Sequence, residues 1–471
     1  MEKMKRKRAK SNRGVEENTL AILESFCSYD SSHVHDDRLA FLEAVRSSSI
    51  VSENGCQPTS KMMEAIFGIM REEKSLELIM FSYRLLCEIE KHFPRVYLLN
   101  GDAEQGSCTK PAELVVFEEA WSPFAVVPDG GSSHKHVAEK GLKEPLNAAD
   151  FHLLLASLTE GVDETDSSET KLELLAKMIL FQYLITALQA DFLPRNQAFL
   201  ANSNWVCLRE SFINKLMGSR TINYKGLVKD CLDALCVPFT RMDHDSEPGE
   251  NISSSLLDSS DLALSLSLPE VEKHTVQAVR KLLVMMMELD SSRKKADTQS
   301  LTTRIDSPRT PVIDLIVDEL SYSKDMISRF LQAFDVPELK LEIISQYLQK
   351  YTAKPSTRNR KSKCPDDALV TGILKVFLNS TSAKAIVKKL GAEAVQVLLA
   401  HTFQACMSIA NDKLLEIYDF KEDAGSTPLG QICKNVISSF TTLKETDESM
   451  QILAFGKEAI FTAATILSTA S

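Results

Sequence analysis

The chain contains few of the residues that break helices. Among its 471 residues are 17 glycines and 16 prolines, together about 7% of the chain, whereas proteins average about 12%. Folds built from many short strands need frequent turns, which glycine and proline largely supply. Their scarcity argues against an all-β protein and leaves room for long helices.

The sequence also lacks the cysteine spacing of a metal site or a disulfide framework. Its ten cysteines are scattered singly, and the closest two are Cys231 and Cys236. This scatter is typical of reduced, mostly buried thiols in an intracellular protein. The histidine pairs at 33/35 and 134/136 lie in polar stretches with no further ligand to complete a site. We therefore expect no metal and no cofactor.

Motifs for catalysis and membrane insertion are missing as well. No GxxxxGK[ST], GxGxxG, HExxH or GxSxG occurs. The charged N-terminus is followed by no apolar segment, so it does not resemble a signal peptide. The most apolar stretch, 172–193, contains Glu173, Lys177 and Asp191, which favours a buried amphipathic helix over a membrane span. The sequence thus predicts a protein that is not an enzyme, with no small-molecule substrate and no membrane partner.

What the chain does contain is helical periodicity. Apolar residues recur at i, i+3, i+4 and i+7 almost throughout. No fixed-period repeat is present, which excludes a regular repeat array. The prediction is an all-α fold, an irregular armadillo/HEAT-like helical stack with disordered polar inserts. Helices are expected near 39–46, 59–70, 76–93, 169–192, 204–217, 222–236, 269–290, from 310, and near 336–351, 366–379, 392–409, 429–443 and 450–468.

Polar stretches divide this helical pattern into regions. The expected organisation is a basic disordered tail (1–16), an N-terminal helical lobe (17–242), a Ser-rich linker (243–268) and a C-terminal helical lobe (269–471). Loops are expected near 101–113, 129–145 and 160–168, and a basic loop near 354–366.

Charge points to two candidate contact segments. The formal net charge of −11 means that the mean field of the protein does not attract DNA. Lys5, Arg6, Lys7 and Arg8 nevertheless form a run that fits a nuclear-import signal, the alternative being a solvated tail. This run predicts a nuclear location. A second run, Arg358, Arg360, Lys361 and Lys363, is either a phosphate-contacting loop or a solvated linker.

Two further segments suggest interaction or modification. Leu262, Leu264, Leu266 and Leu268 alternate in the string LALSLSL. In an extended strand they would share one side and could dock in an apolar groove of a partner. The string resembles the leucine-repeat repression motif of plant regulators; the alternatives are a short strand or the entry to the following helix. Ser307 and Thr310 each precede a proline and are candidate phosphorylation sites, and a phosphate on Thr310 would lie near a helix N-terminus.

Long, idiosyncratic strings, collinear from about residue 17 to the C-terminus, carry a resemblance to a known family. The strings are Val51–Gly55, Glu119–Phe124, Asp191–Gln197, Leu282–Asp297, Arg309–Tyr322, Leu339–Lys350 and Phe455–Glu458. In these strings the chain resembles the plant family of nuclear negative regulators of systemic acquired resistance, suppressors of a defence-coactivator mutant. It departs from that family in its basic N-terminus and in longer Ser-rich inserts, one of which contains LALSLSL.

The resemblance implies a leucine-rich, armadillo-like nuclear scaffold without a catalytic motif. Such proteins dampen pathogenesis-related gene expression and limit homologous recombination. The resemblance also implies a subunit of the structural-maintenance-of-chromosomes complex that contains the fifth and sixth ATPases of that class, beside a second non-ATPase element. Chromatin would then be reached indirectly. The competing hypothesis is a corepressor adaptor brought to promoters by a DNA-binding transcription factor, and a third is direct DNA binding through 358–363.

Overall fold

The structure is a computed structural model, and it describes most of the chain in separate stretches. The predicted basic tail, most of the Ser-rich linker, the basic loop and most of the loops near 101–113 and 129–145 lie outside the described residues. The described residues are 34–52, 55–95, 97–99, 114–116, 121–125, 145–160, 162–163, 167–237, 240–241, 259–303, 306, 309–352, 369–409, 413, 418, 427–446 and 450–470.

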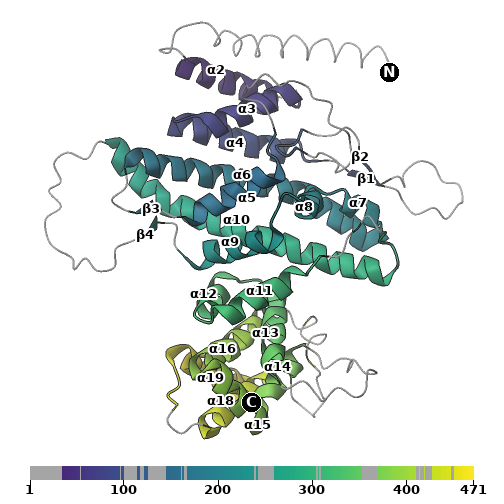
Figure 1. The fold of residues 1–471 in the computed structure, drawn as a ribbon, viewed down its shortest axis with the longest axis vertical. Coiled ribbons are helices and arrows are strands. Elements are labelled where there is room, and N and C mark those ends of the chain that lie inside the picture. Colours follow the sequence, from purple (N-terminus) through teal and green to yellow (C-terminus); the bar gives the residue numbers. More distant parts are fainter. Residues whose placement is uncertain are drawn as a thin grey trace, which may run out of the picture. The chain divides into compact units, whose positions relative to one another are not determined.

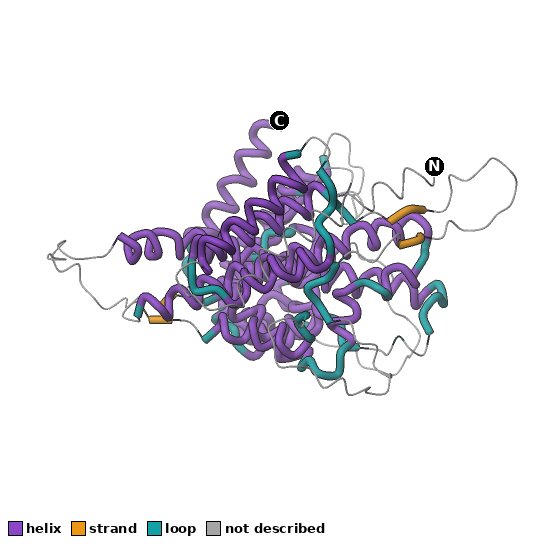
Figure 2. The backbone as a smooth tube through the Cα atoms, turned by 90° about the horizontal axis from the view of Figure 1, so that it is seen from above, coloured by secondary structure: helices purple, strands orange, loops and turns teal. Residues whose placement is uncertain are grey.

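Helices make up nearly all of the described backbone (Figure 2). The prediction of an all-α helical stack is therefore confirmed. The helices are α2 (Val34–Arg46), a π-helical turn η2 (Ser47–Val51), α3 (Ser60–Glu72), α4 (Leu76–His92), α5 (Ala148–Thr159), α6 (Ser168–Asn202), α7 (Trp205–Arg209), α8 (Phe212–Gly218), α9 (Tyr224–Cys236), α10 (Ser259–Thr298), α11 (Val312–Tyr322), α12 (Met326–Ala333), α13 (Pro337–Tyr351), α14 (Leu369–Leu378), α15 (Ser380–Leu390), α16 (Ala392–Ser408), α18 (Pro428–Thr446) and α19 (Ala454–Ala470).

The strands in the described part are short and form no layer. β1 (Tyr97–Leu99) pairs antiparallel with β2 (Leu114–Val116). β3 (Val162–Asp163) pairs parallel with β4 (Thr240–Arg241). The first pair lies between α4 and α5 in the chain, whereas the second joins the connection before α6 to the segment after α9. Neither pair changes the fold class.

The chain divides into two compact units, Met1–Arg309 and Thr310–Ser471. The expected division, with a linker at 243–268 and a C-terminal lobe from 269, does not match this boundary. The reason is α10, whose buried apolar residues pack against α6 and place the whole helix in the N-terminal unit. A helix cannot separate from the partner that covers its apolar face without exposing that face to water.

The N-terminal unit is built around α6 and α10, which lie side by side (Figure 1). Two polar contacts fix their register: Gln182 Nε2 donates to Thr275 Oγ1 at 2.9 Å, and Ser292 Oγ donates to Asn196 Oδ1 at 2.8 Å. The paired residue numbers rise together, so the two helices run parallel. Helices α3 and α4 cover one side of α6, while α5 and α9 cover the other side of the pair.

Both central helices continue through a proline at which the sequence predicts a boundary. The expected helices 169–192 and 269–290 are in fact Ser168–Asn202 and Ser259–Thr298, with Pro194 and Pro269 inside them. A proline removes one backbone hydrogen bond and disfavours helix interiors. In α6 the tertiary contacts of Asp191, Arg195 and Asn196 hold the helix on both sides of Pro194. The expected single helix 204–217 is also corrected: Ser211 caps α8 and separates it from α7.

The C-terminal unit packs α11 to α19 around its own apolar core. Helix α16 lies against α13, α15, α18 and α19. Buried Phe330 and Phe334 stack with their ring centroids 5.3 Å apart. The side chain of Gln396, which is 1% exposed, holds the segment before α19 by accepting from Leu453 N at 2.9 Å and donating to Gln451 O at 3.0 Å. This clamp fixes where α19 begins.

Candidate interaction surfaces

The predicted site residues are not brought together in the described part of the chain. The basic runs Lys5–Arg8 and Arg358–Lys363, and Ser307, lie outside the described residues. Thr310 is exposed and precedes α11, whose N-cap is Pro311, so the helix expected from 310 begins at Val312. Thr310 therefore stays a candidate phosphorylation site.

The LALSLSL segment is helical, which corrects the expectation of an extended strand in a linker. Residues 262–268 lie within α10. In a helix, residues two apart are separated by about 200° around the axis, so alternating leucines do not share one face. Leu268 is 5% exposed and belongs to the core. Of the alternatives, the structure supports the entry to the following helix, and docking as a strand would require this turn of α10 to unwind.

The described cysteines are mostly buried, and burial affects the protonation of their thiols. Cys207, Cys231 and Cys236 are buried, as predicted. Burial raises the pKa of Cys87 to about 11 and that of Cys406 to about 12. These thiols are protonated at neutral pH, the state opposite to the thiolate that a nucleophile needs. Within the described residues no cluster of three His, Cys, Asp or Glu side chains is placed to hold a metal ion.

One string of the resemblance, Asp191–Gln197, forms a buried ion pair that organises the N-terminal unit. Asp191 Oδ1 accepts from Arg195 Nε at 2.9 Å, and its Oδ2 accepts from the backbone N of Phe212 at 2.8 Å. Arg195 Nη1 donates to the carbonyl of Cys207 at 3.0 Å. The pair therefore ties α6 to the middle of α7 and to the start of α8. Asp191 and Arg195, in the string Asp191–Gln197, therefore have a structural role: they hold three helices of the N-terminal unit together.

A groove lies between α18 and α19 in the C-terminal unit. It encloses about 360 Å³. Its lining is mainly apolar, with one cation and one carboxylate at the rim. The lining residues are Ile437, Phe440, Thr441, Lys444, Glu445, Ile452 and Ile460.

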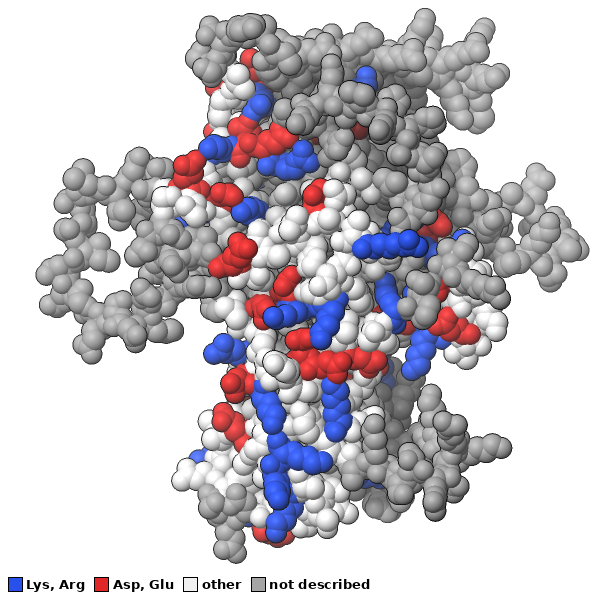
Figure 3. All heavy atoms as spheres, in the orientation of Figure 1, with Lys and Arg blue, Asp and Glu red and all other residues white. Residues whose placement is uncertain are grey.

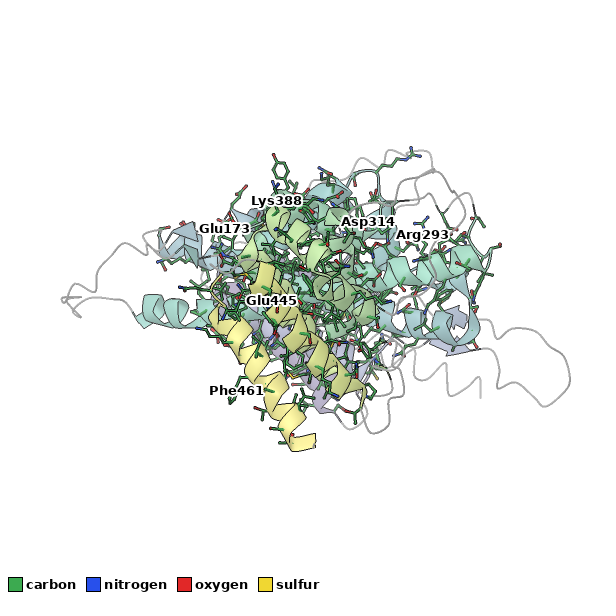
Figure 4. The ribbon with its side chains drawn as sticks, turned by 90° about the horizontal axis from the view of Figure 1, so that it is seen from below. Glu173, Arg293, Asp314, Lys388, Glu445 and Phe461 are labelled. Carbon is green, nitrogen blue, oxygen red and sulfur yellow. The ribbon has the colours of Figure 1, made fainter. Side chains whose placement is uncertain are left out.

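Helix α19, which contributes Ile460 to the groove, also carries an apolar side chain that the unit does not cover. Phe461 is 74% exposed and lies on the outer side of α19 (Figure 4). Burying an exposed phenylalanine against a partner is favourable by about 1.5–3 kcal/mol. The groove together with Phe461, named here the α18–α19 surface, is the described surface best suited to a protein partner. Sequence reasoning missed it, although α19 contains more apolar residues than one core-facing stripe needs.

The longest apolar helix belongs to the core of its unit. By length and composition α6 would be able to cross a membrane, but 67% of its most apolar window is buried. Burial of this extent is typical of the central helix of a folded domain and agrees with the predicted buried amphipathic helix.

Comparisons with known proteins match nearly the whole chain. The SNI1 middle domain matches residues 95–336, and the SNI1 C-terminal domain matches residues 352–471. A relative from Arabidopsis thaliana, named negative regulator of systemic acquired resistance SNI1, is 40% identical over 456 residues. The match covers 96% of this chain and 94% of the relative. No solved structure matches.

Proposed function

This chain belongs to the SNI1 family, and we propose that it works as a non-enzymatic nuclear scaffold that binds proteins through its helical surfaces. Its general role is negative regulation of systemic acquired resistance, the role for which the Arabidopsis relative is named. The finer proposal is that the chain is a subunit of the structural-maintenance-of-chromosomes complex that contains the fifth and sixth ATPases of that class. In this complex it would act in DNA repair and recombination. Repression of defence genes would follow from its action on chromatin.

The observation that carries the scaffold proposal is the α18–α19 surface. A stack of helices offers rigid, partly apolar area without catalytic groups. The groove is large enough for one or two apolar side chains, and Lys444 and Glu445 at its rim can orient the segment that enters. We propose that its occupant is an amphipathic segment of the second non-ATPase element, inserting apolar side chains beside Phe461.

Affinity purification of the tagged full-length protein from plant nuclei, followed by mass spectrometry, tests this proposal. The wild-type protein is expected to recover the two ATPases and the non-ATPase element in near-stoichiometric amounts. Phe461→Asp should lose at least nine-tenths of that recovery, because it places a charge in the apolar contact. The matched control is Lys281→Ala, an exposed change in the N-terminal unit. Recovery without the ATPases, or equal recovery by both variants, refutes the proposal.

The corepressor alternative uses a different part of the chain. It places the contact in Leu262–Leu268, which is helical. The double substitution Leu264→Ser and Leu266→Ser should then abolish repression of a defence-gene reporter and leave recovery of the ATPases intact. Unchanged repression would remove this alternative.

The nuclear location is a separate proposal that rests on the basic N-terminal run. Replacing Lys5, Arg6, Lys7 and Arg8 by glutamine should shift a fluorescent fusion toward the cytoplasm, because the import receptor would lose its cationic ligand. A nuclear fusion after this change would show that another segment directs import.

A further inference from the structure

The C-terminal unit contains a segment whose charge opposes that of the whole chain. The protein has a net charge of −11, yet residues 353–409 carry nine basic and three acidic side chains. The acidic residues are Asp366, Asp367 and Glu393. The basic residues are Lys354, Arg358, Arg360, Lys361, Lys363, Lys375, Lys384, Lys388 and Lys389.

Five of the described lysines of this unit, from α13, α15 and the turn before α12, form one group. Lys324 Nζ, in the turn before α12, donates to the carbonyl of Lys389 at the end of α15 at 2.9 Å. Lys389 Nζ in turn donates to the carbonyl of Tyr351 at the end of α13, at 2.8 Å. Figure 3 shows basic side chains gathered over α13 to α15. We name this the lysine surface: Lys324, Lys350, Lys384, Lys388 and Lys389.

Part of this surface is not neutralised by neighbouring carboxylates. Lys350 pairs with Asp318, but no acidic residue occurs in α15. Among the described residues no carboxylate forms an ion pair with Lys384 or Lys388, and both lysines are exposed. The negative end of a helix dipole favours lysine in the last turn, which accounts for Lys388 and Lys389. It does not account for Lys384 earlier in α15, or for the lysines from other elements.

An exposed aromatic ring accompanies these cations. Tyr322, the last residue of α11, is 91% exposed and precedes Lys324 by two positions. A tyrosine ring in this setting can stack on an unpaired base, while lysines beside it contact phosphates. Protein interfaces, in contrast, are depleted in lysine. The combination of clustered lysines and a solvent-facing ring therefore favours a nucleic acid over an acidic protein.

We propose that the lysine surface binds the phosphodiester backbone of a nucleic acid, with Tyr322 stacking on a base where the strand is unpaired. The proposal does not depend on the scaffold role, because it concerns α11 to α15 and not the α18–α19 surface. Lys384 and Lys388, one helical turn apart and about 6 Å along the axis, provide neighbouring phosphate contacts.

Fluorescence anisotropy with the purified full-length protein tests this inference. The probes are a labelled 30-nucleotide single strand and the matching duplex, titrated between about 50 and 300 mM KCl. Wild-type binding should weaken linearly in log–log form as salt rises. The double variant Lys384→Gln/Lys388→Gln should bind roughly tenfold or more weakly at low salt, with a duplex salt slope reduced by about two. Both substituted side chains are exposed, so the fold should be retained.

Two further variants make the outcome specific. The matched control is Lys229→Gln/Lys281→Gln, which removes two exposed lysines from the N-terminal unit and should leave affinity and slope unchanged. Tyr322→Ala should weaken single-strand binding at least about fivefold and spare the duplex. An equal effect on both probes, or on neither, removes the stacking contact from the proposal.

Other results would overturn the inference itself. Absence of binding at about 50 mM KCl, where phosphate contacts are strong, would refute it. So would equal losses in the α15 variant and the control. Poly-glutamate of equal charge should compete weakly; displacement as effective as that by unlabelled single strand would assign the surface to acidic proteins.

Discussion

The buried ion pair of α6 allows the sharpest test of the N-terminal unit. In Asp191→Ala, Arg195 loses the carboxylate that faces it, and the Phe212 N–H loses its acceptor. The side chains of Asp191 and Arg195 are 1% and 9% exposed, so water cannot replace the lost partner easily. Removing one member of a buried pair costs about 3–5 kcal/mol. With a urea m-value of about 2 kcal/mol/M, the midpoint should fall by about 1.5–2.5 M.

Tryptophan fluorescence during urea unfolding is the appropriate assay. The only two tryptophans of the chain, Trp121 and Trp205, both belong to the N-terminal unit. Trp205 is 2% exposed and begins α7, the helix that Arg195 contacts through Cys207. The signal therefore reports the unit that the substitution destabilises, while far-UV circular dichroism follows both units.

A matched control lies on the same helix at the same spacing. Glu173 and Lys177 form an i,i+4 pair in α6 at 2.8 Å, but their side chains are 65% and 36% exposed. An exposed pair contributes about 0.2–0.5 kcal/mol, so Glu173→Ala should shift the midpoint by about 0.3 M or less. If Asp191→Ala costs no more than Glu173→Ala, burial is not what makes the α6 pair important, and the reasoning fails.

Three further predictions concern tight packing, burial and pH. Gly456→Ala should destabilise the C-terminal unit by about 1–3 kcal/mol, because its new Cβ would lie 3.1 Å from Gln396 Oε1; thermal unfolding by circular dichroism measures this, and an unchanged transition would contradict it. Leu268→Ala should cost about 2–5 kcal/mol by urea unfolding, whereas a leucine exposed for docking would cost almost nothing. The pKa of His401 is lowered to about 4, mainly by burial and to a smaller extent by the positive charge of Lys340. In the unfolded chain the pKa of a histidine is about 6.5. The unfolded state therefore binds the proton first, and stability should fall between pH 6.5 and 4; hydrogen exchange of α16 should show this loss in the wild type and not in His401→Gln.

The pattern of apolar residues predicts the helices because helical geometry is local. In α13 and α18 the residues that the spacing assigns to one face are the buried ones. The N-caps are also local: Thr59 and Asn223 accept from backbone N–H groups three residues ahead. These features depend on neighbours within one or two turns, which the sequence displays directly.

Expectations from the local sequence were wrong where tertiary contacts stabilise a helix through residues that disfavour it. Pro194 and Pro269 predict boundaries by removing a hydrogen bond, yet α6 and α10 continue through them. The leucine alternation at 262–268 suggests a strand by its period of two, but the segment is the first part of a helix that packs on α6. Periodicity in a short Ser-rich segment is ambiguous, and the neighbouring helix determines the outcome.

Sequence alone was enough to predict the helical class, most helix positions, the family resemblance and the basic runs, because these depend on residue type and short-range spacing. The fold was needed to show that the units divide after Arg309, that α6 and α10 run parallel, and that Asp191 and Arg195 pair out of water. It also brought Lys324, Lys389 and Tyr351 together. Such contacts join residues far apart in the chain, and a single sequence carries no local mark of which distant surfaces will meet.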